Sequence, residues 1–173
     1  MGLKSALSKV FAFLVVKGIE KWKFNAVAAQ ERTLQNLIKE AKHTAFGLDH
    51  RFSRLRNYQD FKAAVPLRDY EQLKPYVDRV VAGESDVLWK GKPEYLAKTS
   101  GTTSGVKYVP ISKQSMPQHI KAARNALLTY IHETGNASFV DGKVIFLQGS
   151  PVLSQKNGVK VGRLSGIVAH LVP

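Results

Sequence analysis

Apolar residues recur along the start of the chain at the spacing of amphipathic helices. The first run predicts a helix with an inner face formed by Leu7, Phe11, Leu14, Gly18 and Trp22. The next run predicts a second helix with an inner face formed by Leu34, Leu37, Ile38 and Ala41. Gly47 is expected to end this helical pair, because glycine is favoured where a helix stops.

Residues 57–82 continue in helical character, as short helices separated by breaks. Asp69 is the expected N-cap of one of them, with Gln72 three residues on as its capping-box partner. Pro75 predicts a break or a restart, and Gly83 is expected to close the segment.

The second half of the chain changes to an alternation of strands and helix. Residues 94–98 and 106–112 are expected to form strands, and a helix capped by Ser112 is expected from about Lys113 to Thr134. Its predicted inner face is formed by Met116, Ile120, Ala123, Leu127, Tyr130 and Ile131, and Gly135 is expected to end it. The apolar run 144–147 predicts a strand buried on both faces, and residues 156–158 predict a turn between two more strands.

The elements together predict an α/β chain in two parts. We expect a helical N-terminal segment over residues 1–48 and an incomplete α/β domain over residues 49–173. A hydrophobic content of 44% argues for a globular chain rather than a disordered one. The chain has no cysteine, so disulfides and thiolate metal sites are excluded, and no segment reaches the ~20 apolar residues that span a bilayer. We expect a cytoplasmic protein with no membrane partner.

The charge balance favours an anionic partner. The formal net charge is +13, and the residues after position 94 include nine Lys and Arg but only two acids, Glu133 and Asp141. A piece cut from a larger protein can also carry a charge excess of this kind without any anionic partner. The five histidines show no metal-ligand or triad spacing, so we predict no metal ligand in this chain and assign no catalytic residue.

One loop, residues 98–110, concentrates small polar residues between the first two predicted strands. Glycines let backbone N–H groups converge on one point, hydroxyls add donors, and Lys107 supplies a mobile positive charge, a combination that suits a tri- or pyrophosphate. The loop is not a Walker A site, because Gly101 and Gly105 have three residues between them and Val106 separates Gly105 from the lysine. Composition alone leaves a flexible surface loop as an alternative.

The order of residues in this loop resembles the phosphate loop of the adenylate-forming superfamily. The matching positions are Thr99, Ser100, Gly101, Thr102, Thr103, Ser104, Gly105 and Lys107. The flanking stretches 33–47, 58–89 and 162–167 resemble the Gretchen-Hagen family, the auxin-responsive acyl-acid amido synthetases, and look closer to its bacterial branch. This resemblance covers nearly the whole chain.

The resemblance implies an activity and its partners. A carboxylic acid would react with ATP to give an acyl-adenylate and pyrophosphate, and an amino acid or another amine would then displace AMP to form an amide. The eight loop residues would bind the phosphates of ATP, and Mg²⁺ would neutralise part of their charge, with its ligands outside this chain. Arg124 would border the acyl pocket and attract the substrate carboxylate, although a surface arginine packed on the core explains it as well.

Members of that family run to several hundred residues, so the chain is expected to be an N-terminal fragment or one piece of a split protein. The rest of the adenylation domain and a mobile C-terminal domain would be missing, and the isolated chain would be inactive. One alternative is a non-catalytic basic module that binds phosphate or nucleic acid, although aromatic stacking platforms are absent and we expect no nucleic-acid partner. Another is a regulatory module that keeps the fold without the activity.

Overall fold

The computed structural model describes residues 2–99, 105–143, 145 and 147–170. The chain forms two compact units, each built from two separate stretches of sequence. Met1–Ala29 and Gln114–Leu147 form the first unit, and Gln30–Lys113 and Gln148–Pro173 form the second. The division at residue 48 stays a prediction.

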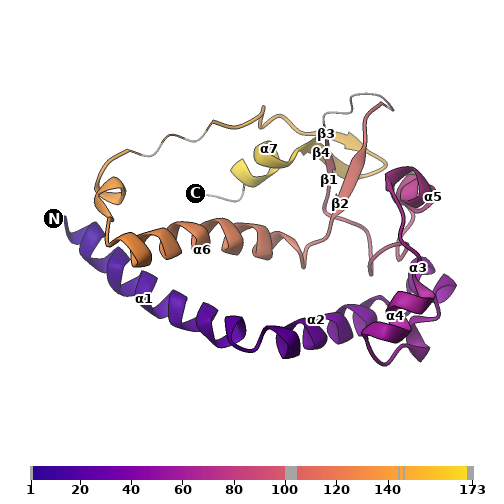
Figure 1. The fold of residues 1–173 in the computed structure, drawn as a ribbon. Helices are drawn as coiled ribbons and strands as arrows, with labels where there is room; N and C mark the ends of the chain where they lie inside the picture. Colours follow the sequence, from indigo (N-terminus) through magenta and orange to yellow (C-terminus); the bar gives the residue numbers. More distant parts are fainter. Residues whose placement is uncertain (1, 100–104, 144, 146, 171–173) are drawn as a thin grey trace. The chain divides into compact units, whose positions relative to one another are not determined.

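The first unit is a pair of long helices followed by a short one. Helix α1 (Leu3–Lys23) lies beside α6 (Met116–Thr134), and the 3-10 helix η2 (Ser138–Asp141) contacts α1 (Figure 1). Ala12 is fully buried in the core of this unit, together with Leu128, Ile131 and Ala137. These small and medium-sized side chains let the two helices approach closely.

The face of α1 that packs is different from the predicted one. The buried residues of the helix are Ser5, Ala12 and Val16, whereas Leu7 is 62% exposed and Trp22 is 56% exposed. The prediction was wrong because apolar residues occur all round this helix. Periodicity alone therefore did not identify the face on which the smaller side chains allow contact with α6.

Helix α6 confirms the predicted helix and its end, but it begins later than expected. Its first residue is Met116 and its N-cap is Ser115, so Ser112 is not the cap. Gly135 ends the helix in the left-handed conformation, with φ 68°. Met116 and Ile131 of the predicted inner face are buried, whereas Leu127 is about half exposed and its neighbour Leu128 is buried instead.

The strand predicted over residues 144–147 is contradicted where the structure describes it. Ile145 and Leu147 are 85% and 98% exposed and lie in no strand, while residues 144 and 146 fall outside the described part. A run of apolar residues indicates burial only when a second surface covers it, and the described residues leave Ile145 and Leu147 exposed.

Helices form the beginning of the second unit. Most of helix α2 (Ala26–Ala41) belongs to this unit, and three short helices follow it: α3 (Ala45–Asp49), the 3-10 helix η1 (Phe52–Arg54) and α4 (Tyr58–Ala64). Ile38, Ala41 and Phe52 form the buried centre of this group. Gly47 does not end the pair as predicted: it lies inside α3, where an added Cβ would come within 2.0 Å of the Ala41 carbonyl oxygen. Glycine is needed there for close packing of the backbone.

Helix α5 (Tyr70–Val81) confirms the predicted capping box and contradicts the predicted break. The Asp69 carboxylate accepts a hydrogen bond from the Gln72 N–H at 2.8 Å, and the Gln72 side chain accepts one from the Asp69 N–H at 2.9 Å. Pro75 lies within the helix without ending it. Val77 and Val80 follow the proline in the helix and are buried in the core. Their burial stabilises the helix by more than the loss of the one hydrogen bond that a proline removes. Gly83 follows the end with φ 93°, as its predicted role requires.

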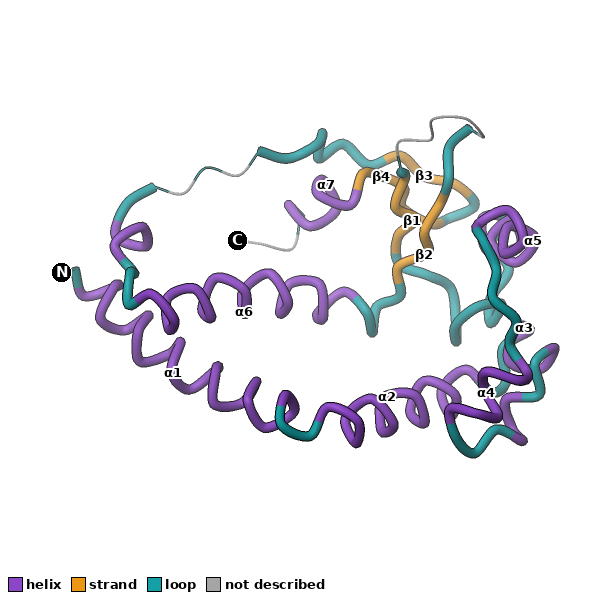
Figure 2. The backbone as a smooth tube through the Cα atoms, viewed as in Figure 1, coloured by secondary structure: helices purple, strands orange, loops and turns teal. Residues whose placement is uncertain are grey.

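A four-stranded sheet with the order β2-β1-β4-β3 forms the remainder of the second unit (Figure 2). The strands are β1 (Tyr95–Lys98), β2 (Tyr108–Ile111), β3 (Ser154–Lys156) and β4 (Val159–Arg163), and α7 (Leu164–Ala169) follows β4. Strands β1 and β4 are parallel, and the two flanking pairs are antiparallel. Leu96 and Val161 pack against Val77 and Val80 of α5, so the sheet and this helix share one core. The predicted turn is confirmed at Asn157 and Gly158, which have φ 51° and 82°.

Candidate functional site

The predicted phosphate loop connects β1 and β2 at the edge of the sheet. The two strands pair antiparallel, with Lys98 opposite Tyr108, and the Thr99 N–H donates a hydrogen bond to the Lys107 carbonyl at 3.0 Å. The two ends of the loop are therefore joined by backbone pairing. Of the eight predicted loop residues, Thr99, Gly105 and Lys107 are described, whereas Ser100, Gly101, Thr102, Thr103 and Ser104 lie outside the described residues.

Gly105 has a conformational reason to be glycine. Its φ is 83°, in the left-handed region, and a Cβ added there would meet no atom within 4 Å. Space does not demand glycine at this position, but the backbone does, because L-residues with a side chain seldom adopt this φ. Gly105 lies two residues before Lys107 and three before the start of β2.

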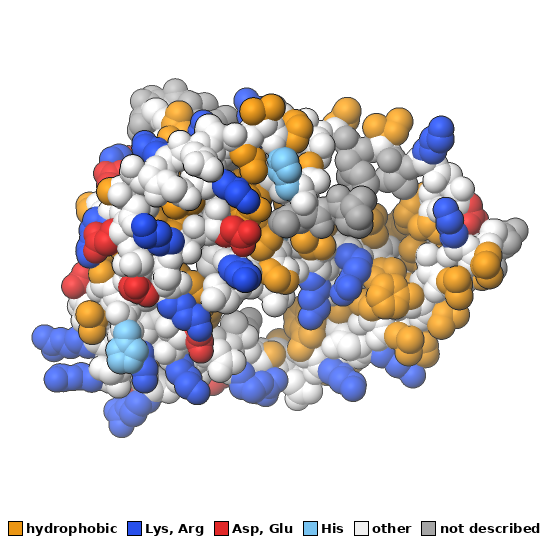
Figure 3. Space-filling view, turned by 180° about the vertical axis from the view of Figure 1, so that it is seen from behind, with side chains coloured by type: hydrophobic (Ala, Val, Ile, Leu, Met, Phe, Trp, Pro, Cys, Tyr) orange, Lys and Arg blue, Asp and Glu red, His pale blue; other side chains and the backbone are white. Residues whose placement is uncertain are grey.

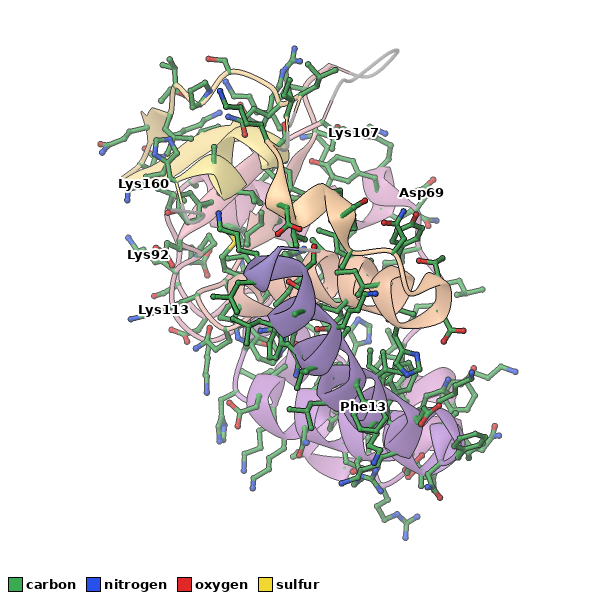
Figure 4. The ribbon with its side chains drawn as sticks, turned by 90° about the vertical axis from the view of Figure 1, so that its left-hand side faces the viewer. Phe13, Asp69, Lys92, Lys107, Lys113 and Lys160 are labelled. Atoms are coloured by element: carbon green, nitrogen blue, oxygen red, sulfur yellow. The ribbon has the colours of Figure 1, made fainter. Side chains whose placement is uncertain are left out.

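Lys107 contacts the start of helix α5. Its ammonium lies 3.4 Å from a carboxylate oxygen of Glu71 and 4.9 Å from the centre of the Tyr70 ring. Figure 4 shows Lys107 on the same side of the second unit as Asp69, the N-cap of that helix. The lysine is two-thirds buried, so its position is defined by packing as well as by charge.

Tyr70 and Glu71 are the neighbours that the sequence did not reveal. They precede Lys107 by 37 and 36 positions. Nothing in the pattern around Asp69 distinguishes a capping box that also lies beside the predicted phosphate loop. The Tyr108 N–H donates to the Tyr70 hydroxyl at 2.9 Å, and the hydroxyl lies 3.4 Å from the Tyr108 carbonyl oxygen, to which it donates. A single side chain thus contacts both polar groups of the residue after Lys107.

Two further cationic side chains lie at the carboxyl ends of the parallel strands β1 and β4. Lys98 and Arg163 are paired in the parallel register of β1 and β4, at the carboxyl ends of both strands, and both are exposed. Ligands of open α/β sheets bind outside the carboxyl ends of parallel strands. The loop continues directly from Lys98, so the carboxyl ends of β1 and β4 combine a ligand-binding position with positive charge.

Positive charge is widespread on the surface beyond this edge. Blue Lys and Arg side chains are spread over much of the face shown in Figure 3 and outnumber the red acidic ones. The other lysines near the sheet contact aromatic rings: Lys156 lies 5.1 Å from the centre of the Tyr108 ring, and Lys160 lies 5.5 Å from that of Tyr95. The general excess of charge therefore does not by itself single out the loop, whereas the order of its residues does.

Arg124 belongs to the first unit, whereas the loop belongs to the second. Its guanidinium lies 5.7 Å from the centre of the Phe11 ring and donates to the Asn125 side-chain oxygen at 3.2 Å. These contacts agree with the packing alternative raised from the sequence. A carboxylate-binding role for Arg124 stays a prediction.

The described residues hold no group of three or more His, Asp or Glu side chains that would bind a metal ion. The two acids after residue 94 are engaged elsewhere. Asp141 accepts hydrogen bonds from Gly2 and Ser5, and Glu133 lies 3.4 Å from the His132 ring nitrogen. The described residues thus do not fit a Mg²⁺ site, and we derive no step of the chemistry through that ion. Within the same residues, no helix is long and apolar enough to cross a membrane.

Comparison with known proteins places the chain in a family. The family model described as "GH3 family N-terminal domain" matches residues 15–172. The jasmonoyl-L-amino acid synthetase JAR4 of Nicotiana attenuata is 26% identical over 151 residues, which cover 86% of this chain and 26% of JAR4. The indole-3-acetic acid-amido synthetase GH3.15 of Arabidopsis thaliana is 36% identical over 80 residues, 44% of this chain and 13% of that protein.

The fold agrees with a solved member of the same group. A structure of the acyl acid amido synthetase AtGH3.15 in complex with 2,4-DB has a TM-score of 0.79 and is 22% identical, over 92% of this chain and 28% of that one. The chain thus spans only about a quarter of the length of the relatives that it matches over most of its own length. Because the family model covers nearly all of it, the chain belongs to the GH3 family and carries that family's N-terminal domain.

Proposed function

We propose that this chain forms the polyphosphate-binding part of an ATP-dependent acyl-acid amido synthetase. The names of the relatives support the reaction class, since one describes a jasmonoyl-L-amino acid synthetase and the other an amido synthetase of indole-3-acetic acid. The loop supports ATP as the activating substrate, because its residue order is that of a phosphate loop and it follows β1 at the carboxyl edge of a parallel strand pair.

The proposed reaction has two steps. In the first, a carboxylate oxygen of the acid attacks the α-phosphorus of ATP, an O–P bond forms, and the bond to pyrophosphate breaks. In the second, an amine attacks the acyl carbon, the amide bond forms, the amine loses a proton, and AMP leaves. Each step releases a phosphate group whose charge must be stabilised in the transition state.

The residues of this chain act on the leaving pyrophosphate in the proposal. Hydroxyl and backbone N–H groups of residues 99–105 would donate hydrogen bonds to its oxygens, and Lys107 would supply a positive charge. The observation that carries the proposal is the position of Lys107. It follows left-handed Gly105, pairs with Thr99 across the base of the loop, and presents its ammonium against α5.

Carboxylate-dependent ATP–pyrophosphate exchange by the full-length enzyme tests this proposal. Lys107→Ala should lower the exchange rate by at least tenfold, which corresponds to about 1.4 kcal/mol of transition-state stabilisation. Lys92→Ala is the matched control, because Lys92 is an exposed lysine of the same unit and lies well apart from Lys107 in Figure 4.

Unchanged exchange in the Lys107 variant would exclude a phosphate-binding role for this residue. The alternative of a non-catalytic basic module predicts a different result in a binding experiment. Such a module would bind ATP, pyrophosphate and nucleic acid with no nucleotide preference, and its affinity would fall steeply with salt for all three.

A further inference from the structure

At Tyr108, the Tyr70 hydroxyl group covers the free edge of the sheet beside the loop. Strand β2 is the outer strand, so one side of its backbone has no neighbouring strand. The Lys107 carbonyl accepts the hydrogen bond of Thr99 and therefore points toward β1. The Tyr108 N–H belongs to the same trans peptide and so points the other way, into the free edge.

Tyr70 of helix α5 occupies that free edge. Its hydroxyl accepts a hydrogen bond from the Tyr108 N–H at 2.9 Å and donates one to the Tyr108 carbonyl at 3.4 Å. A hydroxyl is suited to this position because it accepts and donates at once, as a paired strand would. The backbone immediately after Lys107 is thereby attached to α5.

The same side chain also supports the ammonium of Lys107. The Tyr70 ring lies 4.9 Å from that nitrogen, and the next residue, Glu71, places a carboxylate oxygen 3.4 Å from it. The Glu71 side chain is about half exposed, and an ion pair at such a site contributes little to stability. Lys107 is therefore able to exchange Glu71 for a phosphate while the hydrogen bonds of Tyr70 persist.

We propose that Tyr70 is a positioning residue for Lys107, which holds the lysine at the phosphate site before the nucleotide binds. This inference rests on the proposed function of the loop. Its physical basis is that a lysine whose backbone is already fixed loses less conformational freedom when it binds phosphate. Glu71 acts as the partner of the ammonium in the absence of ligand.

Tyr70→Phe in the full-length enzyme isolates the hydroxyl, since it keeps the ring and removes both hydrogen bonds to Tyr108. We expect the KM for ATP in pyrophosphate exchange to rise about threefold to tenfold, with the KM for the acid unchanged. The control is Tyr76→Phe, which removes a hydroxyl of the same helix that donates to Asp49 at 2.7 Å. This control should leave both KM values as they are.

A double substitution separates positioning from general stability. If Tyr70 acts through Lys107, Tyr70→Phe should add no more than about a twofold effect in a Lys107→Ala background. Independent, additive losses would show a purely structural role and overturn the inference. So would an unchanged KM for ATP in Tyr70→Phe, or an equal effect of Tyr76→Phe. Impaired Lys107→Ala with normal Tyr70→Phe would leave the proposed function standing, whereas normal Lys107→Ala would overturn both.

A second measurement needs no turnover and uses the 173-residue chain itself. Acetylation of lysines by an amine-reactive reagent, followed by mass spectrometry, reports the accessibility of each ammonium. Tyr70→Phe should raise the acetylation rate at Lys107 at least twofold and leave that at Lys92 unchanged. Equal rates at Lys107 in the original chain and in the variant would contradict the inference.

Discussion

The carboxylate of Asp141 accepts a hydrogen bond from the backbone N–H of Ser5 at 3.2 Å, although the two residues lie 136 positions apart. The same carboxylate accepts one from the Gly2 N–H at 3.0 Å and one from the Ser5 hydroxyl. Gly2 at the N-cap offers no side chain to satisfy these groups. Asp141 of η2 thus caps α1 from the far end of the first unit's sequence.

This cap predicts a pH-dependent stability. The hydrogen bonds from Ser5 and Gly2 lower the pKa of Asp141 from its ordinary value of 3.8. Since the folded pKa lies below the unfolded one, the stabilisation is complete above about pH 4 and is lost as the pH falls through the folded value. We expect Asp141→Asn to lower the Tm at pH 6 by a few degrees, and the difference from the original chain should shrink as the pH falls below 3.8.

Thermal unfolding followed by circular dichroism across this pH range measures the effect. Glu133→Gln is the control, because it removes the other acid of the second half at an exposed site. A difference between the original chain and Asp141→Asn that stayed constant down to pH 2 would show that the Asp141 charge does not stabilise α1.

Arg124 is predicted to bind the acid substrate through its charge. Arg124→Ala in the full-length enzyme should raise the KM for the acid about tenfold or more and leave that for ATP nearly unchanged, because a carboxylate would lose its partner. Phe11→Ala is the comparison, since it removes the ring beneath the guanidinium and keeps the charge. If both variants lower the Tm alike and neither alters a KM, the contact with Phe11 is the whole role of Arg124.

Leu96 connects the shared core of the second unit to the loop. It is fully buried in β1, two residues before Lys98, and packs with Val77 and Val80 of α5. Leu96→Ala should lower the free energy of unfolding by about 2–5 kcal/mol, through lost burial and the cavity left behind. Denaturant titration measures this loss, and Val109→Ala serves as the control because Val109 of β2 is about half exposed. A loss below about 1 kcal/mol would mean that the site collapses around the smaller side chain.

The isolated 173-residue chain should not form an acyl-adenylate. Its described residues provide no acidic metal site, and its relatives carry about three-quarters of their length beyond the matched part. We expect no acid-dependent pyrophosphate release with ATP, Mg²⁺ and a panel of carboxylic acids. Pyrophosphate should bind only weakly and in a salt-sensitive manner, because charge supplies most of the attraction. Robust acid-dependent turnover would show that this chain contains a complete active site.

Local chemistry made several features predictable from the sequence. The capping box of Asp69 and Gln72 depends on residues three positions apart, and the stop at Gly135 depends on one residue's tolerance of positive φ. The turn at Asn157 and Gly158 depends on the same tolerance of positive φ. The α/β character of the second half was predicted from its strand-like and helical runs of apolar residues. The order of residues from Thr99 to Lys107 resembled the phosphate loop of the adenylate-forming superfamily, and the flanking stretches 33–47, 58–89 and 162–167 predicted the family.

Contacts between distant residues were beyond such rules. The sequence marked α1 as a helix but not the face that packs, since only the arrival of α6 made Ala12 rather than Leu14 the buried position. Gly47 proved to be a point of close backbone approach, and Pro75 stayed within a helix that the core holds on its far side. In the same way, the sequence by itself predicted that Lys107 belongs to a phosphate-binding loop. Only the tertiary structure decided that Tyr70 and Glu71 hold it, because no local pattern records which helix will lie against the free edge of a sheet.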